Sequence, residues 1–193
     1  VLHGAGREDI DAVMLGSGRP FILEIVNPRI READLKVLED TINAQNEGRI
    51  GVTDLRWSAR SEVETLKSHK GHKKYRILVD IDGSVPDTAL QSAVQKLSGA
   101  IIRQRTPTRV AHRRADKVRE RGVLDIRYTG KEGKDFVLEV TGEAGLYIKE
   151  LISGDQGRTT PSLTEVLKTP ARVVQLDVIH VEGTDQVKSH GTS

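Results

Sequence analysis

The chain has 193 residues, of which 30% are charged, with a formal net charge of +2 and no cysteine. This length allows one compact domain with a buried core, and the absence of cysteine excludes disulfide bonds, thiolate nucleophiles and cysteine-ligated metals from this sequence. No apolar run approaches the roughly 18 residues of a membrane span, so we expect no membrane association and a cytoplasmic location, or a nuclear one in a eukaryote.

The first third of the sequence predicts two strands and two helices. The apolar run at 21–26 predicts a mostly buried strand that ends before Pro28. Apolar residues at helical spacing predict a helix over 32–45, with its apolar face in the core. Alternation at 50–57 predicts a half-exposed strand, and the polar segment 61–68 is compatible with a helix.

The remainder predicts strands interspersed with helices. Apolar residues recur at helical spacing between Pro86 and Gly99, which predicts a helix with those bounds. The glycines of 130–133 predict a hairpin turn, and Ser162 is a suitable N-cap for a helix over 162–167. We further expect a short helix at 147–152 and strands at 75–81, 101–102, 118–128, 136–140 and 171–181.

These elements predict an α+β fold with a mixed, largely antiparallel sheet flanked by helices. We expect residues 1–182 to form one domain and the polar residues 183–193 a frayed tail. The sequence starts at Val1, and candidate catalytic residues appear within ten positions of it. We therefore expect a fragment that lacks a preceding domain or preceding strands.

Positive charge is concentrated between residues 103 and 121, which we call the basic segment. It contains only two acids, and seven of its eight cations are arginine, the side chain whose planar fork best matches phosphate. The eight are Arg103, Arg105, Arg109, Arg113, Arg114, Lys117, Arg119 and Arg121. This pattern favours a nucleic-acid backbone as the partner; a solvated charged strand or helix is the alternative.

Three short motifs combine a carboxylate, aromatic rings and a cation. Gly6-Arg7-Glu8-Asp9 places an acid beside an arginine in a glycine-led turn, and the segment from Gly145 to Leu151 contains Tyr147 and Lys149. Lys73-x-Tyr75 opens a predicted strand after a basic loop. Together these motifs resemble the active-site motifs of pseudouridine synthases.

The resemblance implies a role for each motif residue. Asp9 would be the catalytic aspartate, and Tyr147 would pack against the target nucleotide. Lys149 would pair with Asp9 and favour its ionised form, and Tyr75 would stack on the flipped base. Asp11 is a rival to Asp9 that spacing alone cannot exclude, because two residues apart on a strand point to the same face; only Asp9 matches the motif.

The overall resemblance is to the archaeal and eukaryotic family that modifies uridines 54 and 55 in the T arm of tRNA. It implies a pseudouridine synthase fold, tRNA as partner, and no metal and no other cofactor. The family also has an amino-terminal RNA-binding domain, which we expect to be missing from this sequence. A non-catalytic RNA-binding module that keeps the synthase fold is the alternative function. The sequence does not indicate an oligomeric state.

The candidates for RNA contact lie mainly in the basic segment. Pro107 predicts an irregular loop there, from which side chains can reach a folded RNA. We expect contacts from Arg105, Arg109, His112, Arg113, Arg114 and Arg158. Arg7 either contacts a substrate phosphate or braces the loop that carries Asp9.

Overall fold

The computed structural model describes residues 1–182, which divide into two compact units. The N-terminal unit comprises residues 1–6 and 20–69, and the sheet unit comprises residues 7–19 and 70–182. The candidate site residues predicted above all belong to the sheet unit.

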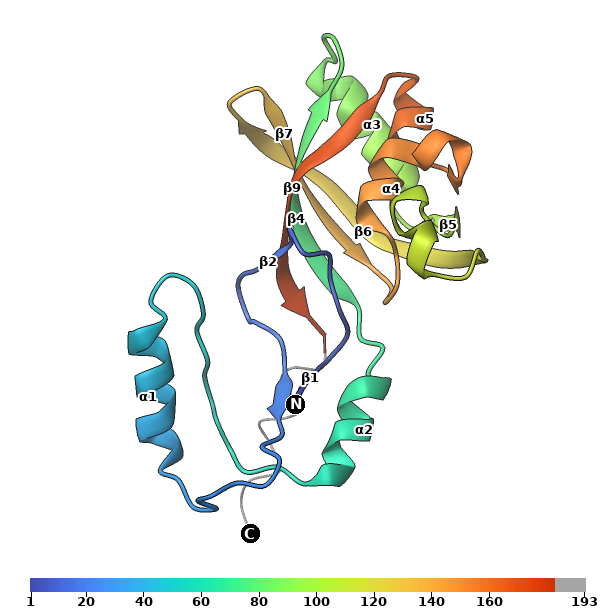
Figure 1. The fold of residues 1–193 in the computed structure, drawn as a ribbon. Coiled ribbons are helices and arrows are strands. Elements are labelled where there is room, and N and C mark those ends of the chain that lie inside the picture. The colour runs from blue at the N-terminus through green and yellow to red at the C-terminus, as the bar shows by residue number, and fades with distance from the viewer. Residues whose placement is uncertain (183–193) are drawn as a thin grey trace. The chain divides into compact units, whose positions relative to one another are not determined.

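A seven-stranded sheet is the framework of the sheet unit (Figure 1). The strand order is β2-β9-β4-β7-β6-β5-β8; β2 runs parallel to β9, and every other neighbouring pair is antiparallel. This mixed sheet confirms the predicted fold class. The strands are β2 (Val13–Met14), β4 (Lys73–Ile81), β5 (Ile101–Arg105), β6 (Val118–Glu132), β7 (Asp135–Gly142), β8 (Thr159–Thr160) and β9 (Ala171–Val181).

Three helices cover the sheet and supply part of its core. They are α3 (Asp87–Leu97), α4 (Ile148–Ser153) and α5 (Leu163–Leu167). In Figure 1 they gather on one side of the sheet, where α3 packs against β6 and α5, and α4 packs against β9 and α5. Two 3-10 segments, η1 (Thr108–Arg113) and η2 (Gly154–Gly157), connect these elements.

The predicted periodicities are realised in the sheet unit. Side chains of β4 alternate between buried and half-buried from Lys73 to Ile81, as expected of a strand with one face on the core. The predicted apolar face of α3 is buried, with Leu90 and Leu97 fully inaccessible. Ser162 caps α5 as predicted, because its hydroxyl accepts the backbone N–H of Glu165 at 3.2 Å.

The hairpin between β6 and β7 turns later than predicted. Its turn lies at Gly133 and Lys134, between the paired residues Glu132 and Asp135. Gly130 lies inside β6 at an irregularity in the register. A glycine tolerates a strand irregularity as readily as a turn, so composition alone could not distinguish the two positions.

The N-terminal unit contains the predicted helices but not the predicted burial. Strands β1 (Leu2–Gly4) and β3 (Phe21–Leu23) pair antiparallel, and the helices are α1 (Leu35–Gln45) and α2 (Arg60–Ser68). Neither helix has a buried residue. The prediction that the apolar face of α1 lies in the core is therefore wrong for the part of the chain that the structure describes.

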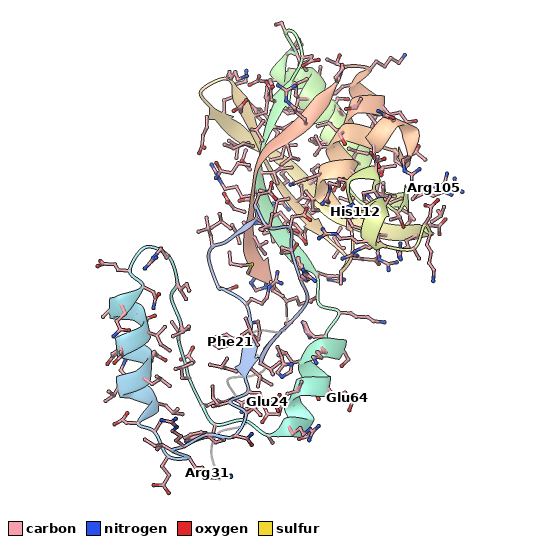
Figure 2. The ribbon with its side chains drawn as sticks, viewed as in Figure 1. Phe21, Glu24, Arg31, Glu64, Arg105 and His112 are labelled. Atoms are coloured by element: carbon pink, nitrogen blue, oxygen red, sulfur yellow. The ribbon has the colours of Figure 1, made fainter. Side chains whose placement is uncertain are left out.

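Two strand predictions in this unit also fail. The run at 21–26 forms only the three-residue β3, on which Phe21 is 38% exposed (Figure 2). Residues 50–57 form no strand. An apolar pattern predicts a face that can be covered, but the run at 21–26 pairs only over β3, with β1, and no strand among residues 1–182 pairs with 50–57.

Candidate active site

The loop from Arg7 to Ala12 carries the predicted catalytic aspartate. A turn closes it, with the backbone N–H of Ala12 donating to the carbonyl of Asp9 at 3.1 Å. The loop then enters β2, which pairs with β9 through Val13 and Met14. This parallel pairing holds the loop at the end of the sheet, although β9 lies more than 150 residues further along the chain.

Asp9 lies between two cations from distant segments. Its Oδ1 accepts a hydrogen bond from Arg109 Nη1 at 2.7 Å, and its Oδ2 lies 3.9 Å from Lys149 Nζ. The Asp9 side chain is 26% exposed. The carboxylate is thus held by positive charge and still accessible from solvent.

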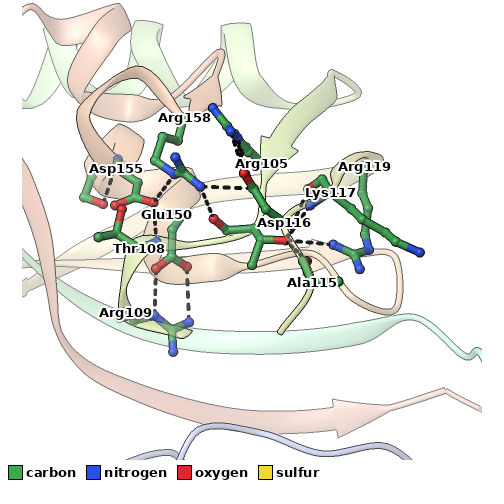
Figure 3. A network of polar contacts seen from close by, with 12 residues as sticks. Arg105, Thr108, Arg109, Ala115, Asp116, Lys117, Arg119, Glu150, Asp155 and Arg158 are labelled. Atoms are coloured by element: carbon green, nitrogen blue, oxygen red, sulfur yellow. Dashed lines mark hydrogen bonds and ion pairs between the residues drawn. The ribbon is translucent and has the colours of Figure 1, made fainter. Parts of the chain in front are cut away.

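Arg109 is itself held by a buried carboxylate on α4. Its Nε and Nη2 donate to the two oxygens of Glu150 at 2.7 and 3.2 Å, as Figure 3 shows. The Glu150 side chain is only 6% exposed. Burial opposes the charge on Arg109, but the hydrogen bonds to Glu150 and Asp9 prevail and raise the pKa of its guanidinium.

Lys149 lies closer to Asp11 than to Asp9. Its Nζ is 2.7 and 2.9 Å from the two Asp11 oxygens, compared with 3.9 Å from Asp9. The hydrogen bond from Lys149 lowers the pKa of Asp11 below its ordinary value. The short hydrogen bond to Asp9 comes from Arg109, a residue that the sequence led us to expect on RNA.

Tyr147 is fixed through its backbone. The fully buried side chain of Gln104 accepts from the Tyr147 N–H and donates to its carbonyl, both at 2.9 Å. The half-buried ring directs its hydroxyl toward Arg114, whose Nη1 donates at 3.1 Å. Gln104 therefore sets the start of α4, the helix that carries Lys149 and Glu150.

Tyr75 is buried, with 3% of its surface exposed. Its hydroxyl lies 3.5 Å from Glu8, which also pairs with Lys73 and, at 2.7 Å, with Arg19. Burial first, and then the Glu8 charge, raise the pKa of the Tyr75 hydroxyl. The phenol consequently stays protonated at neutral pH, and Lys73 and Glu8 connect Tyr75 to the loop that carries Asp9.

The residues predicted to contact RNA differ in the ion pairs and hydrogen bonds that their side chains already form. Arg105 pairs with Asp116, and Arg158 donates to the carbonyl of Thr106 at 2.7 Å and reaches Asp116 at 3.3 Å (Figure 3). Both line an open pocket of about 470 Å³. His112, labelled with Arg105 in Figure 2, is exposed.

The other candidates are also exposed. Arg7, Arg113 and Arg114 all lie at the surface. Arg113 forms no ion pair with any of residues 1–182. Of the predicted RNA contacts within the basic segment, Arg113 is therefore the side chain whose charge is most available to a phosphate.

Four residues of this arrangement were missed by sequence reasoning or given another role. Glu8, Gln104 and Glu150 were not singled out, and Arg109 was assigned to RNA. Glu150 had a detectable signal, because it lies in a short helix among Ile148, Leu151 and Ile152, all buried. A carboxylate in such a setting needs a cationic partner.

The site's chemistry is that of an accessible carboxylate held between an arginine and a lysine. Among residues 1–182, no three histidine, aspartate or glutamate side chains group to hold a metal ion. In the same range, no helix is both long and apolar enough to cross a membrane.

The sequence matches known proteins over nearly its whole length. A family model described as "Pus10, C-terminal" matches residues 1–182. The chain is 50% identical over 188 residues to a protein of Methanothrix thermoacetophila named tRNA pseudouridine synthase Pus10, covering 97% of this chain and 41% of that protein. A protein of the same name from Archaeoglobus fulgidus is 51% identical, with coverages of 93% and 50%.

The fold also has a counterpart among solved structures. A chain in a crystal structure of a Cbf5-Nop10-Gar1 complex superposes with a TM-score of 0.61 at 20% identity, covering 94% of this chain and 40% of that one. At this identity the likeness concerns the fold alone. The chain spans about two fifths to one half of the length of the curated relatives it matches.

Proposed function

Because this chain belongs to the Pus10 C-terminal family, we propose that it is the catalytic domain of a tRNA pseudouridine synthase and that Asp9 is its catalytic carboxylate. The observation that carries the proposal is the setting of Asp9. It is partly exposed and lies between Arg109 and Lys149, in a loop whose sequence matches the aspartate motif.

The reaction is an isomerisation that needs only a positioned carboxylate. The N1–C1′ bond of a uridine breaks, the uracil turns, and a C5–C1′ bond forms. The C5 proton is released and N1 gains a proton, so no oxidant or reductant takes part. An ionised Asp9 either attacks C1′ or removes the proton at C2′, and both routes require the target nucleotide to leave its stack.

The surroundings of Asp9 suit this role. Arg109 and Lys149 place positive charge beside the Asp9 carboxylate. Tyr147, fixed by Gln104 at the start of α4, offers a ring against which a nucleotide can pack. Tyr75, the proposed stacking residue, is buried, so stacking on its ring requires the base to displace residues that cover it.

The motif resemblance supports uridines 54 and 55 of the T arm as targets. We propose that the exposed cations Arg7, Arg113 and Arg114, with His112 when protonated, bind the tRNA backbone. Arg105 and Arg158 would add to this surface beside their pocket. Phosphate contacts of this kind supply affinity and register rather than base recognition.

The first prediction concerns Asp9. The whole protein is incubated with tRNA transcript labelled with tritium at uracil C5, because each isomerisation releases that label. We expect release by the wild type and none by Asp9→Asn, which keeps the size of the side chain but removes its charge. Transcripts with cytidine at position 54, 55 or both identify the targets, since each substitution removes the label from that site.

Asp11→Asn is the matched comparison. Asp11 is 63% exposed and engages Lys149, so we expect its variant to release tritium, at a reduced rate. Full activity of Asp9→Asn with loss in Asp11→Asn would reverse the assignment. Binding of tRNA by the wild type without any release would support the RNA-binding module instead.

A further inference from the structure

We propose that Arg109, anchored by the buried Glu150, is the positioning residue that holds Asp9 for catalysis. This inference rests on the proposed role of Asp9. It assigns to Arg109 a function inside the active site in place of the RNA contact that the basic segment suggested.

Arg109 divides its nitrogens between two carboxylates. Nε and Nη2 form a two-pronged pair with the Glu150 carboxylate, and only Nη1 reaches Asp9, at 2.7 Å. Because a guanidinium is planar, fixing two of its nitrogens also fixes the direction of the third. Glu150 therefore determines where Nη1 points, and Nη1 determines where Asp9 Oδ1 lies.

Glu150 and its partner Arg109 are largely shielded from solvent. Glu150 is 6% exposed on a helix whose other inward residues are apolar. A buried carboxylate requires a partner with matching geometry, and Arg109 is the cation that the structure places on it. The Arg109 side chain is itself only 33% exposed. An arginine that serves a phosphate would instead direct its donors toward solvent.

Helix α4 acts on two acids of the loop by different routes. Lys149 binds Asp11 directly, whereas its neighbour Glu150 acts on Asp9 through Arg109. Lys149 therefore interacts mainly with Asp11, and less closely with Asp9, the carboxylate proposed to react. Arg109 is left as the cation in direct hydrogen-bond contact with Asp9.

The test separates positioning from RNA binding by measuring three quantities in the whole protein. These are the single-turnover rate of tritium release, the Kd for tRNA, and the dependence of that Kd on salt. The variants are Arg109→Lys, which keeps the charge but cannot hold two partners in one plane, and Glu150→Gln, which keeps the size but removes the anchor.

We expect both variants to slow the single-turnover rate while Kd and its salt dependence stay within about twofold of wild type. A misplacement of about 1 Å can cost on the order of 100-fold in rate, and we expect a loss of that order for Arg109→Lys. Arg113→Ala is the matched comparison, because removal of a phosphate contact weakens tRNA binding and lowers the salt slope by about 1.

Chemical rescue provides a readout that a merely structural role would not give. In Arg109→Ala, added methylguanidinium should occupy the space beside Glu150 and restore part of the rate, saturably. The same addition should fail in the double variant Arg109→Ala/Glu150→Gln. Arg127→Gln, which removes an exposed arginine of β6 paired with Asp125, controls for the loss of a positive charge and should keep the wild-type rate.

A wild-type rate in Arg109→Lys, or a weakened Kd with a reduced salt slope in place of a slower rate, would overturn the proposal. Thermal melting of each variant shows whether it folds; if Arg109→Ala does not, Arg109→Lys and Glu150→Gln decide. Failure of the proposed function has a different signature, because either the wild type then releases no tritium or Asp9→Asn remains active, whatever the Arg109 variants do.

Discussion

Three acidic side chains lie close together in the loop before β2, and each is matched with a cation from elsewhere in the sheet unit. Glu8 pairs with Lys73 and Arg19, Asp9 with Arg109, and Asp11 with Lys149. Neighbouring carboxylates would otherwise repel one another and favour protonation. Each matched cation offsets the negative charge of its acid, and of Asp9 and Asp11, the two aspartates considered for catalysis, Asp9 is the less exposed.

The buried hydroxyl of Tyr75 makes the folded protein less stable at alkaline pH. Burial and then Glu8 raise the pKa of its hydroxyl above the ordinary value of 10.0, so its contribution to stability is complete below that pH. Above it, the unfolded chain loses a proton that the folded chain keeps. The free energy of unfolding therefore falls as pH rises, by about 1.4 kcal/mol per pH unit for this one group.

We predict that Tyr75→Phe weakens this decline. Urea unfolding of the wild type and the variant at pH 8, 10 and 11 measures the difference between their free energies of unfolding, which should shift in favour of the variant as pH rises. If the two proteins change in parallel over the whole range, Tyr75 does not keep its proton in the folded state.

At the level of elements, the two-residue strand β2 determines where the loop of Asp9 lies. Its parallel pairing with β9 is what brings the loop of Asp9 to the sheet. Gly16, which follows β2, has a positive φ of 67°, and a Cβ there would lie 2.2 Å from the carbonyl oxygen of Ile179 on β9. The close approach of the two backbones requires glycine at this position.

We predict that Gly16→Ala destabilises the protein more than Gly18→Ala. Gly18 also has a positive φ, 71°, but has open space around it, so alanine there incurs only the left-handed backbone strain of about 1 kcal/mol. At Gly16 the clash adds about 1–3 kcal/mol. Urea unfolding measures the free energy of unfolding of both variants. An equal decrease in the two variants would mean that β2 and β9 separate easily. Tritium release should also slow in Gly16→Ala.

At the level of the whole molecule, the two units differ in how much apolar surface they bury. The sheet unit contains a continuous apolar core built from the strands β4, β6, β7 and β9 and the helices α3, α4 and α5. In the N-terminal unit, helices α1 and α2 have no buried residue. Since buried apolar surface is the main source of stability, the two units should open with different free energies.

We predict that hydrogen exchange is much faster in α1 than in β4. Native-state exchange followed by mass spectrometry on the chain of 193 residues should show α1 exchanging through local opening, while the amides of β4 exchange only on global unfolding. Equal protection of both segments would show that α1 is covered. Repeating the measurement in the whole protein then reports whether other parts of it protect α1.

Local sequence patterns were sufficient for most elements of the sheet unit. Helices α3, α4 and α5 and strands β4 and β9 follow from apolar spacing and capping residues, which act within a few positions of one another. The same patterns predicted α1 and α2 but misjudged the burial of α1. Spacing identifies an apolar face, whereas its burial depends on another element that covers it.

The residue types of the candidate site were also contained in the sequence, because the motifs around Asp9, Tyr75 and Tyr147 each occupy a few consecutive positions. Only the tertiary structure decided which of those groups touch. Arg109 reaches Asp9 across 100 residues of chain, and Glu150 reaches Arg109 across 41. Contacts over such separations arise from strand order and helix packing, and no local spacing in the sequence encodes them.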